Sequence, residues 1–579
     1  MNLLKMLRDT TPSKNQNLKH LKTRWTDTID PSSVWQEYPR MQLRREAYQS
    51  LNGIWDCEIT DSKNLPNRFS KKIVVPFGMG SLCSGILDVL QPNQYLWYKT
   101  WFRTPFRKKV ILHFEAVDQV CHVYLNNQEI FYHEGGYTPF EIEISKYLLE
   151  ENELILCVQD YTDTSMYSRG KQRLKREGMW YTPIAGIWQS VWLEEVEENY
   201  IQDIFYQTRD DLKSIECTIT SPEREAYTMK IGNQIVKGFT NEKRIIPLEE
   251  VHLWEIDSPY LYDVTIQMSK DFVESYFGLR LITKEKDEDG YYKVFLNHKP
   301  IFIHGLLDQG YWSDGVLTPP CDEALIYDIQ TMKELGFNTL RKHIKIENRR
   351  FYYHCDRLGM LVIQDMVNGG ASYNGNVVTI LPTLFKYMWN HYDDKKHDLS
   401  QRNETFKAQW LQECRESIQL LKNHPSIISW CVFNEGWGQF HAKQVTSILR
   451  EEDNMRLFDS TSGWFDQGCG DFLSIHIYFR NLFLPKLDNR ICLISEYGGY
   501  AWNIQGHSAL ESAYGYQRYT NRESLNIACK ELMKQAGPLM KEGLAGLIYT
   551  QVSDVEEEVN GILSYDREIV KFDKDTFKL

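Results

Sequence analysis

From about residue 284 onward, the chain alternates short β-rich apolar runs with stretches of helical periodicity. Eight such runs occur: PIFIHG, NTLRKHI, MLVIQDM, IISWCVFNE, MRLFDSTS, FLSIHIY, CLISEY and LAGLIYTQ. Helical patterns such as DEALIYDIQTMKELG and ETFKAQWLQECRESIQLLKNH lie between several of them. Eight strands that alternate with helices predict a (β/α)8 TIM barrel. A doubly wound open sheet is the alternative, but the GxGxxG signature of a dinucleotide-binding fold is missing, so the pattern favours the barrel.

The residues before this region predict two further domains, both built from strands. Up to about residue 195, runs such as VILHFEAV, CHVYLNNQEI and ELILCVQDY are separated by turn residues, which is typical of a jelly-roll β-sandwich. A shorter set (IECTITS, YTMKIGN and LYDVTIQM) has the length of an immunoglobulin-like sandwich, and the charged stretch KEKDEDG marks its exit. We therefore predict a sugar-binding-like jelly roll over residues 1–195, an immunoglobulin-like domain over 196–283 and a barrel over 284–579.

Charge and cysteine usage narrow the class of function. The formal charge of −13 argues against a nucleic-acid or anionic-membrane partner, and no run of eighteen apolar residues exists that could span a membrane. The twelve cysteines are scattered and form no CxxC pair, which is typical of buried thiols in a reducing compartment rather than of a zinc site. The N-terminal stretch lacks an uninterrupted apolar segment with a cleavage site, so we expect a cytoplasmic protein.

Polar side chains gather where the predicted barrel strands end. Glu435 closes the fourth run and Glu496 the seventh, and each is followed within two residues by glycine. The loop after strand one and the ends of strands two, three, six and eight add Asp308, Trp312, Arg341, His343, Asp365, His476, Tyr478, Tyr549 and Gln551. In a barrel the C-terminal strand ends all face one mouth, where active sites are built. Two carboxylates at that mouth are the minimum equipment for cleaving a glycosidic bond.

These motifs resemble those of glycoside hydrolase family 2, which comprises β-galactosidases, β-glucuronidases and β-mannosidases. WYKTWF, GGYTPFEIEI and YTPIAGIWQSVWLE are similar to the sugar-binding jelly roll of the family, and DSPYLYDVTI and SYFGLR to its immunoglobulin-like domain. NTLRKH, CDRLGMLVIQDM, HPSIISWCVFNEG and ISEYGG are similar to its barrel. The resemblance implies a carbohydrate substrate and retaining hydrolysis. It assigns Glu435 as acid/base and Glu496 as nucleophile, and Asn434 as a ligand of the sugar 2-hydroxyl.

The remaining candidates each have a structural alternative. We expect the Arg341 guanidinium on strand two to reach Glu496 and hold it ionised, the alternative being an ion pair internal to the barrel. His476 and Tyr478 either line the sugar subsite or support the residues that do. Asp308, Trp312 and Asp365 are placed to bind sugar hydroxyls or, equally, to order loops. These residues, together with His343, Tyr549 and Gln551, complete the predicted substrate-binding set.

Two departures from the family pattern leave the sugar open. In many family members the strand-two arginine is followed by a small residue and then by His-Tyr-Pro. In this chain the arginine, Arg341, is followed by Lys-His-Ile-Lys. The Asn-x-Lys motif with which family glucuronidases grip a carboxylate is missing from VNGILSYDREI, which disfavours a typical β-glucuronidase. No match to the metal positions of the large β-galactosidases is found, so we predict neither metal nor cofactor.

The leading hypothesis is a retaining exo-β-glycosidase of β-galactosidase type. The alternatives are a β-mannosidase, a β-glucuronidase or galacturonidase, or an arabinosidase. A non-catalytic carbohydrate-binding protein is a further class, but it would be indicated by the loss of Glu435 or Glu496, and both are present. Family members often assemble through their β-domains, which leaves a homo-oligomer open.

Overall fold

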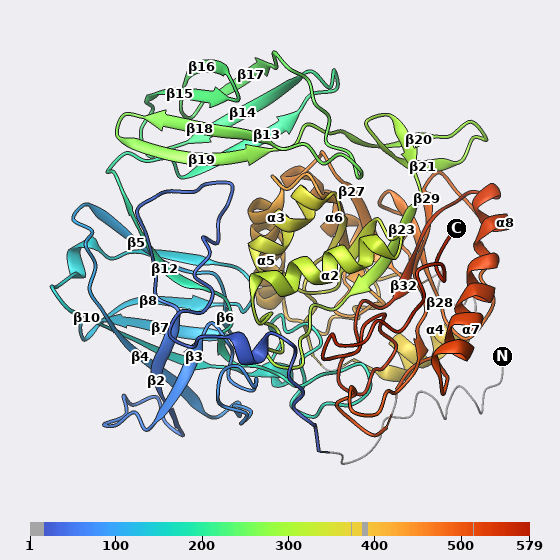
Figure 1. Ribbon diagram of the computed structural model, residues 1–579, viewed down its shortest axis with the longest axis horizontal. Helices are drawn as coiled ribbons and strands as arrows, with labels where there is room; N and C mark the ends of the chain where they lie inside the picture. The colour runs from blue at the N-terminus through green and yellow to red at the C-terminus, as the bar shows by residue number, and fades with distance from the viewer. Residues whose placement is uncertain (1–16, 372, 385–391, 513) are drawn as a thin grey trace.

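The protein consists of two β-sandwiches and a parallel barrel, as the sequence predicted (Figure 1). The computed structural model describes residues 17–371, 373–384, 392–512 and 514–579. In Figure 1 the first sandwich lies at the left, the second at the top and the barrel at the right. No helix among the described residues is both long and apolar enough to cross a membrane.

The first sandwich pairs a four-stranded with a six-stranded antiparallel sheet. The four-stranded sheet has the order β1 (Tyr48–Ser50), β12 (Val191–Val196), β5 (Lys109–Phe114), β9 (Phe140–Glu143). The six-stranded sheet has the order β3 (Lys71–Val75), β2 (Gly53–Thr60), β4 (Tyr95–Phe102), β10 (Asn152–Gln159), β7 (Val120–Leu125), β8 (Gln128–Glu134). Leu112 and Leu193 of one sheet and Val123 and Leu156 of the other share one buried core, since strands direct alternate side chains inward.

The second sandwich pairs a three-stranded with a four-stranded sheet. The orders are β13 (Asp203–Thr208), β14 (Ser214–Thr220), β17 (Lys243–Pro247), and β16 (Gln234–Phe239), β15 (Ala226–Ile231), β18 (Tyr262–Met268), β19 (Asp271–Phe277). Along β15, buried and exposed side chains alternate strictly, as expected for a strand with one solvated face.

A small antiparallel sheet that the sequence analysis did not predict connects this sandwich to the barrel. It consists of β20 (Ile282–Lys286), β21 (Tyr292–Leu296) and β22 (Lys299–Ile301). The stretch KEKDEDG begins in β20 and turns into β21. The first residues of the predicted barrel strand belong to β22 instead. The barrel strand itself, β23 (Ile303–Asp308), therefore begins later than predicted and ends at Asp308. Asp308 therefore belongs to the strand itself and not to the loop after it.

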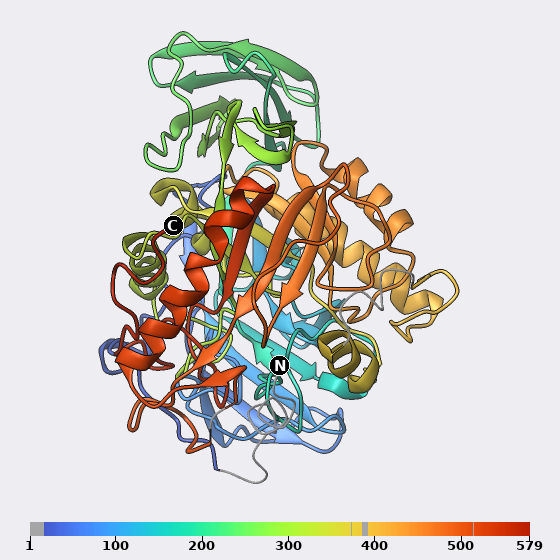
Figure 2. The ribbon, with the colours of Figure 1, turned by 90° about the vertical axis from the view of Figure 1, so that its right-hand side faces the viewer.

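The barrel is a parallel sheet of eight strands (Figure 2). Their order is β27 (Leu457–Ser462), β26 (Ile427–Asn434), β25 (Leu361–Asp365), β24 (Thr339–Lys342), β23 (Ile303–Asp308), β32 (Leu544–Thr550), β29 (Ile491–Gly498), β28 (Phe472–Ile477). The two strands at the ends of this order, β27 and β28, lie against each other and bring the barrel close to closure. Each of the eight predicted runs contributes one strand, and the runs read as continuously apolar because helices cover the outer face.

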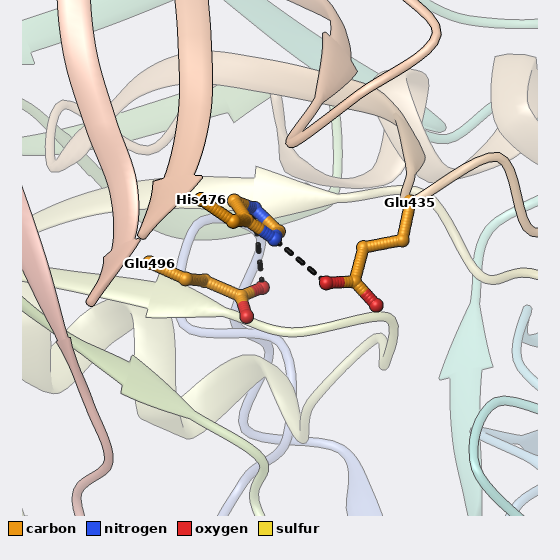
Figure 3. A group of neighbouring side chains, drawn as sticks. All are labelled: Glu435, His476 and Glu496. Carbon is orange, nitrogen blue, oxygen red and sulfur yellow. Dashed lines mark hydrogen bonds and ion pairs between the residues drawn. The ribbon is translucent and has the colours of Figure 1, made fainter. Parts of the chain in front are cut away.

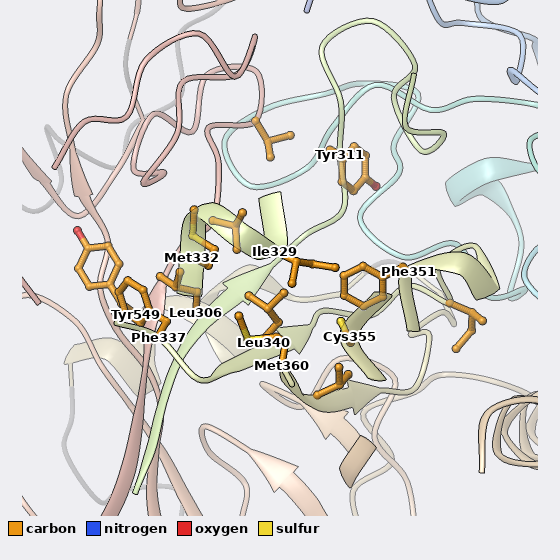
Figure 4. Close-up of a cluster of buried hydrophobic side chains, with 14 of the residues drawn as sticks. Leu306, Tyr311, Ile329, Met332, Phe337, Leu340, Phe351, Cys355, Met360 and Tyr549 are labelled. Carbon is orange, nitrogen blue, oxygen red and sulfur yellow. The ribbon is translucent and has the colours of Figure 1, made fainter. Parts of the chain in front are cut away.

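Helices surround the barrel and bury its outer face. They are α2 (Asp322–Glu334), α3 (Arg349–Leu358), η4 (Asn376–Ile380), α4 (Leu381–Leu384), α5 (Glu404–Leu421), α6 (Ala442–Glu452), α7 (Arg522–Lys534) and α8 (Ala536–Lys541). Both helices that the sequence predicted, α2 and α5, are confirmed. The Asn403 side chain caps α5 by accepting a hydrogen bond from the backbone N–H of Phe406. Figure 4 shows Ile329 of α2 packed among Leu306 and Leu340 of the neighbouring strands.

The remaining elements are short. They are η1 (Thr26–Thr28), β6 (Val117–Asp118), η2 (Ser145–Tyr147), η3 (Thr162–Thr164), β11 (Gly186–Ile187), β30 (Tyr500–Ala501) and β31 (Gln517–Arg518).

Candidate active site

The two glutamates meet at the C-terminal end of the barrel. Glu435 directly follows β26, and Glu496 lies near the end of β29. Glu435 has a φ of 50°, a left-handed conformation that costs a non-glycine residue about 1–3 kcal/mol, and its N–H donates to the Ser462 carbonyl oxygen at 2.9 Å. Both side chains are 5% exposed. One oxygen of each carboxyl group and a ring nitrogen of His476 all lie within 4.8 Å of one another (Figure 3).

Donors surround the Glu496 carboxylate. Arg341 Nη1 lies 3.1 Å from its Oε1, and the Tyr478 hydroxyl donates to its Oε2 at 2.5 Å. His476 Nε2 is 3.5 Å from Oε1. Burial raises the pKa of Glu496 and the charge of Glu435 raises it further, while Arg341 and the Tyr478 hydrogen bond oppose this upward shift. These donors favour the ionised form of this carboxyl group.

Glu435 has a different environment, in which the described residues supply one hydrogen-bond partner to its carboxyl group. Its Oε1 lies 2.8 Å from His476 Nδ1. Burial raises the pKa of Glu435 to about 8, although the charges of Lys171 and Arg341 oppose this shift. The site therefore holds one carboxyl group that is protonated at neutral pH beside one whose neighbours favour the carboxylate.

Arg341 connects the polar groups at the mouth. Its Nε and Nη2 donate to the two oxygens of Asp365 at 2.9 and 3.0 Å, and Nη2 also donates to Asn434 Oδ1 at 2.8 Å. His343 Nδ1 lies 2.8 Å from Asp365 Oδ2. The Asn434 Nδ2 group is buried and has no hydrogen-bond partner among the described residues. Arg341 thus fixes the amide of Asn434 so that its donor is left for a ligand.

Replacing Arg341 with lysine should lower kcat/KM about 100-fold and move the acidic limb of its pH profile to higher pH. A single ammonium group cannot serve Asp365, Glu496 and Asn434 together, so Glu496 loses a donor that stabilises its carboxylate. Arg350→Lys is the control, because Arg350 makes a similar forked pair with Asp322 on the helices. An acidic limb that stays in place in Arg341→Lys would contradict this role.

Three residues of the predicted substrate-binding set contact groups other than the carboxyl pair. Tyr549 packs outside the barrel against Phe572 and Phe577, because adjacent residues of a strand face opposite sides (Figure 4). The Arg567 guanidinium lies over the ring of Trp312, with Arg567 Cζ 4.1 Å from the ring centroid. Asp308 forms an ion pair with Lys342 at 2.7 Å.

Gln551 and the acidic loop after β32 form a connected polar group. Gln551 Nε2 donates to Asn560 Oδ1 at 2.7 Å, and Asn560 Nδ2 donates to Glu558 Oε1 at 3.1 Å. Glu558 accepts a hydrogen bond from the Tyr181 hydroxyl of the first sandwich. Gln551 therefore supports the mouth through Glu558.

The first sandwich also contributes to the mouth, which the strand pattern did not predict. The segment 168–182, here called the sandwich segment, lies on the barrel mouth, where the N–H of Arg169 donates to the Asn368 carbonyl oxygen at 3.0 Å. It buries Lys171, whose ammonium group lies 5.6 Å from the ring centroid of Trp437 and 5.7 Å from that of Tyr181. The signal in the sequence was the basic and aromatic stretch SRGKQRLKREGMWYT, which no strand pattern explained.

Two more residues shape the mouth without having been predicted. The ring of Tyr516 stacks on that of Tyr478 with centroids 3.7 Å apart. Trp437, two residues after Glu435, lies 5.2 Å from Trp180 of the sandwich segment. Aromatic faces of this kind provide apolar contact area for a ligand.

Glu435, His476 and Glu496 also have the spacing of a three-ligand metal site. Glu435 Oε1 is already hydrogen-bonded to His476 Nδ1, and Arg341 Nη1 lies 3.1 Å from Glu496 Oε1. A cation there would have to compete with the guanidinium and with the proton on Glu435. The donor set therefore fits proton chemistry better than metal binding.

Three domains of one protein family match this chain in succession. Residues 89–196 match the sugar-binding domain of glycosyl hydrolases family 2, and residues 289–490 match the TIM barrel domain of that family. Residues 200–280, between them, match the domain described simply as glycosyl hydrolases family 2. A β-galactosidase of Thermoanaerobacter pseudethanolicus is 27% identical over 460 residues, which are 73% of this chain and 56% of that protein. A β-glucuronidase of Streptococcus agalactiae is 27% identical over 435 residues, or 69% of this chain and 68% of that protein. The chain thus matches little more than half the length of the first of these relatives.

Solved structures share the architecture at lower sequence identity. A β-glucuronidase of an uncultured Clostridium species has a TM-score of 0.70 at 20% identity and covers 91% of this chain, with 96% of its own chain matched. A β-galacturonidase of Eisenbergiella tayi bound to galacturonate has a TM-score of 0.69 at 18% identity, covering 93% of this chain and 99% of its own. Because three domain models of a single family match most of its length in order, the chain belongs to glycoside hydrolase family 2.

Proposed function

We propose that the protein is a retaining exo-β-glycosidase in which Glu496 is the nucleophile and Glu435 the acid/base. The observation that carries the proposal is the approach of the two carboxyl groups to within 4.8 Å. Retaining glycosidases hold their carboxyl groups about 5–5.5 Å apart, whereas inverting enzymes leave about 6.5–9.5 Å for a water molecule. The unequal environments of the two groups support the division of roles.

In the first step the Glu496 carboxylate attacks the anomeric carbon. The bond to the leaving oxygen breaks, and the proton of Glu435 passes to that oxygen. In the second step the Glu435 carboxylate takes a proton from water, whose oxygen displaces Glu496 and releases the sugar. Arg341 and the Tyr478 hydroxyl hold Glu496 for the attack, and the free Asn434 Nδ2 donor is available to the sugar 2-hydroxyl.

For the sugar, we propose a β-galactoside as the first candidate. The relatives named β-galactosidases support it, and so does the missing Asn-x-Lys motif of the glucuronidases. A β-uronide is the second candidate, favoured by one observation. The buried Lys171 ammonium makes no hydrogen bond or ion pair with any residue that the structure describes, and an unpaired buried cation suits a carboxylate ligand.

A panel of para-nitrophenyl glycosides tests the function. It should contain β-galactoside, β-glucuronide, β-galacturonide, β-mannoside and α-L-arabinoside. We expect the highest kcat/KM on the β-galactoside, with the β-anomer of the sugar appearing first by NMR. The α-anomer as first product would refute retention, and activity on uronides alone would replace the first candidate by the second. No hydrolysis on the panel or on oligosaccharides would favour a carbohydrate-binding protein.

Replacing Lys171 with methionine should move the alkaline limb of kcat/KM to higher pH. The positive charge stabilises the Glu435 carboxylate and so lowers the pKa of this group, and its removal lets the acid stay protonated further into the alkaline range. If a uronide is the substrate, KM for it should also rise at least about tenfold. Lys175→Met is the matched control, since Lys175 is exposed on the same segment. An unchanged alkaline limb would contradict the assigned effect of Lys171.

A further inference from the structure

His476 lies beneath the two carboxyl groups and is closed off from solvent. Its side chain is 0% exposed, so a sugar in the mouth cannot touch it. Nδ1 lies 2.8 Å from Glu435 Oε1, and Nε2 lies 3.0 Å from the Ser462 hydroxyl. Figure 3 shows the ring between the two glutamates. Its contacts therefore bear on the reacting groups and not on the substrate.

A chain of buried serine hydroxyls continues from the imidazole into the barrel. The Ser462 hydroxyl donates to Ser495 Oγ at 2.8 Å, and the Ser474 hydroxyl donates to the same oxygen at 2.6 Å. The Ser495 hydroxyl donates to the Ile475 carbonyl oxygen at 3.4 Å. All three serines are buried, so water does not compete for these bonds. The Ser474 hydroxyl also hydrogen-bonds Asp459 and lies 3.4 Å from Ser462 Oγ, so Ser495 Oγ is the nearest hydroxyl acceptor for the Ser462 hydrogen.

Counting hydrogens fixes the tautomer of His476. With the Ser462 hydrogen in the 2.8 Å bond to Ser495, the Ser462 oxygen accepts from His476, and this assignment places the ring hydrogen on Nε2. Burial lowers the pKa of His476 to about 4, so the imidazole is neutral and carries a single ring hydrogen. Nδ1 is then an acceptor. A contact of 2.8 Å between this acceptor and Glu435 Oε1 requires the hydrogen to be on the glutamate.

We propose that His476 is a positioning residue that holds the proton and the orientation of the general acid, in a tautomer set by the serine chain. The proposal rests on the function assigned to Glu435 above. In the free enzyme Nδ1 accepts the Glu435 proton, and Oε2 makes no hydrogen bond with the described residues. The proton leaves for the sugar's leaving oxygen in the first step and is regained from water in the second. His476 keeps its own hydrogen on Nε2 throughout.

The arrangement also strengthens Glu435 as a base. After the first step its carboxylate faces the lone pair of Nδ1, which disfavours the charged form and increases its affinity for a proton from water. Other charged and titratable groups act on Glu435 and His476 from the surrounding elements. They are Lys171, Arg341, Asp365, Tyr478, Glu496, Tyr514, Tyr516 and Glu558. Their contributions are unchanged when the serine chain alone is altered.

Ser462→Ala tests the proposal because it leaves His476 in place and removes the acceptor that fixes its tautomer. The imidazole can then place its hydrogen on Nδ1 and donate to the Glu435 carboxylate. We expect the alkaline limb of kcat/KM to move to lower pH by about one unit. We also expect kcat to fall at least about tenfold on glycosides with poor leaving groups, and much less on 2,4-dinitrophenyl glycosides, which need no acid.

His476→Leu, which removes the acceptor altogether, should shift the limb in the same direction. His304→Gln is the control, because His304 is a second buried histidine whose pKa burial lowers to about 4, at the start of β23 and outside the site. An alkaline limb that stays within about 0.2 unit of wild type in folded Ser462→Ala, or equal losses for both leaving groups, would overturn the proposal. Failure of the proposed function itself would look different, since the wild-type protein would then hydrolyse no glycoside.

Discussion

Glu496→Gln is expected to lose turnover of an aryl β-glycoside by about 10⁴-fold or more, the largest effect that we predict. The amide has nearly the same size, and its one oxygen can keep one of the two hydrogen bonds that Arg341 and Tyr478 donate to the carboxylate, so the fold should persist. It cannot attack the anomeric carbon. A loss of 10⁴-fold corresponds to about 5.4 kcal/mol of activation free energy. Steady-state kinetics on the best substrate of the panel measures it.

Azide separates loss of the nucleophile from general damage. In Glu496→Ala the cavity admits azide, which should attack the activated sugar directly and yield a glycosyl azide of inverted configuration. Glu413→Gln is the matched control, because Glu413 is a partly buried glutamate on α5 outside the site, and its variant should remain active. Normal hydrolysis by Glu496→Gln would show that the nucleophile is another residue.

Glu435→Gln is expected to lose about 10²–10⁴-fold in kcat/KM on substrates with poor leaving groups. Dinitrophenyl glycosides need no protonation of the leaving oxygen, so the first step should remain fast for them and the glycosyl-enzyme should accumulate. The wild-type alkaline limb should fall near pH 8, where burial places the pKa of Glu435, because activity requires the protonated acid and is lost as the pH rises through this pKa. In the glutamine variant this limb should disappear.

The product formed with azide distinguishes the two glutamates. In Glu435→Ala, azide replaces water in the second step and should give a glycosyl azide of retained configuration, opposite to that from Glu496→Ala. A burst of dinitrophenol before the steady state would report the accumulated intermediate. An alkaline limb that persists in Glu435→Gln would assign the acid to another group.

The barrel could be predicted because its strands are continuous apolar runs of limited length. Strand boundaries were less accessible, since a run buried on both faces has no alternation to mark its ends. PIFIHGLLD contains the last two residues of β22 and all of β23, and only the three-dimensional pairing separates Ile301 from Ile303. The same reasoning explains why the small sheet of β20, β21 and β22 was read as a mere exit from the sandwich.

Within the site, the residues found from sequence are those whose position follows from strand ends. Glu435, Glu496 and Arg341 meet because parallel strands finish at one mouth. Tyr549 shows the limit of that argument. Alternate residues of a strand face the barrel interior and the helices, and an unbroken apolar run does not show which residues face which side. Lys171 shows another limit, since a residue from a different domain has no sequence signal that connects it to the barrel.

The contact between the sandwich segment and the loop after β32 has a consequence for how the chain matures during synthesis. Glu556 accepts from the N–H of Thr182 at 2.9 Å, and Glu557 and Glu558 accept from Gly178 and Tyr181. The ribosome makes the sandwich segment long before these three glutamates, so the first sandwich can fold and wait as a template. A barrel severed from it would lose these three hydrogen bonds at its own entrance. The entrance of the barrel is therefore completed only when the loop after β32 has been made and closes onto the sandwich segment.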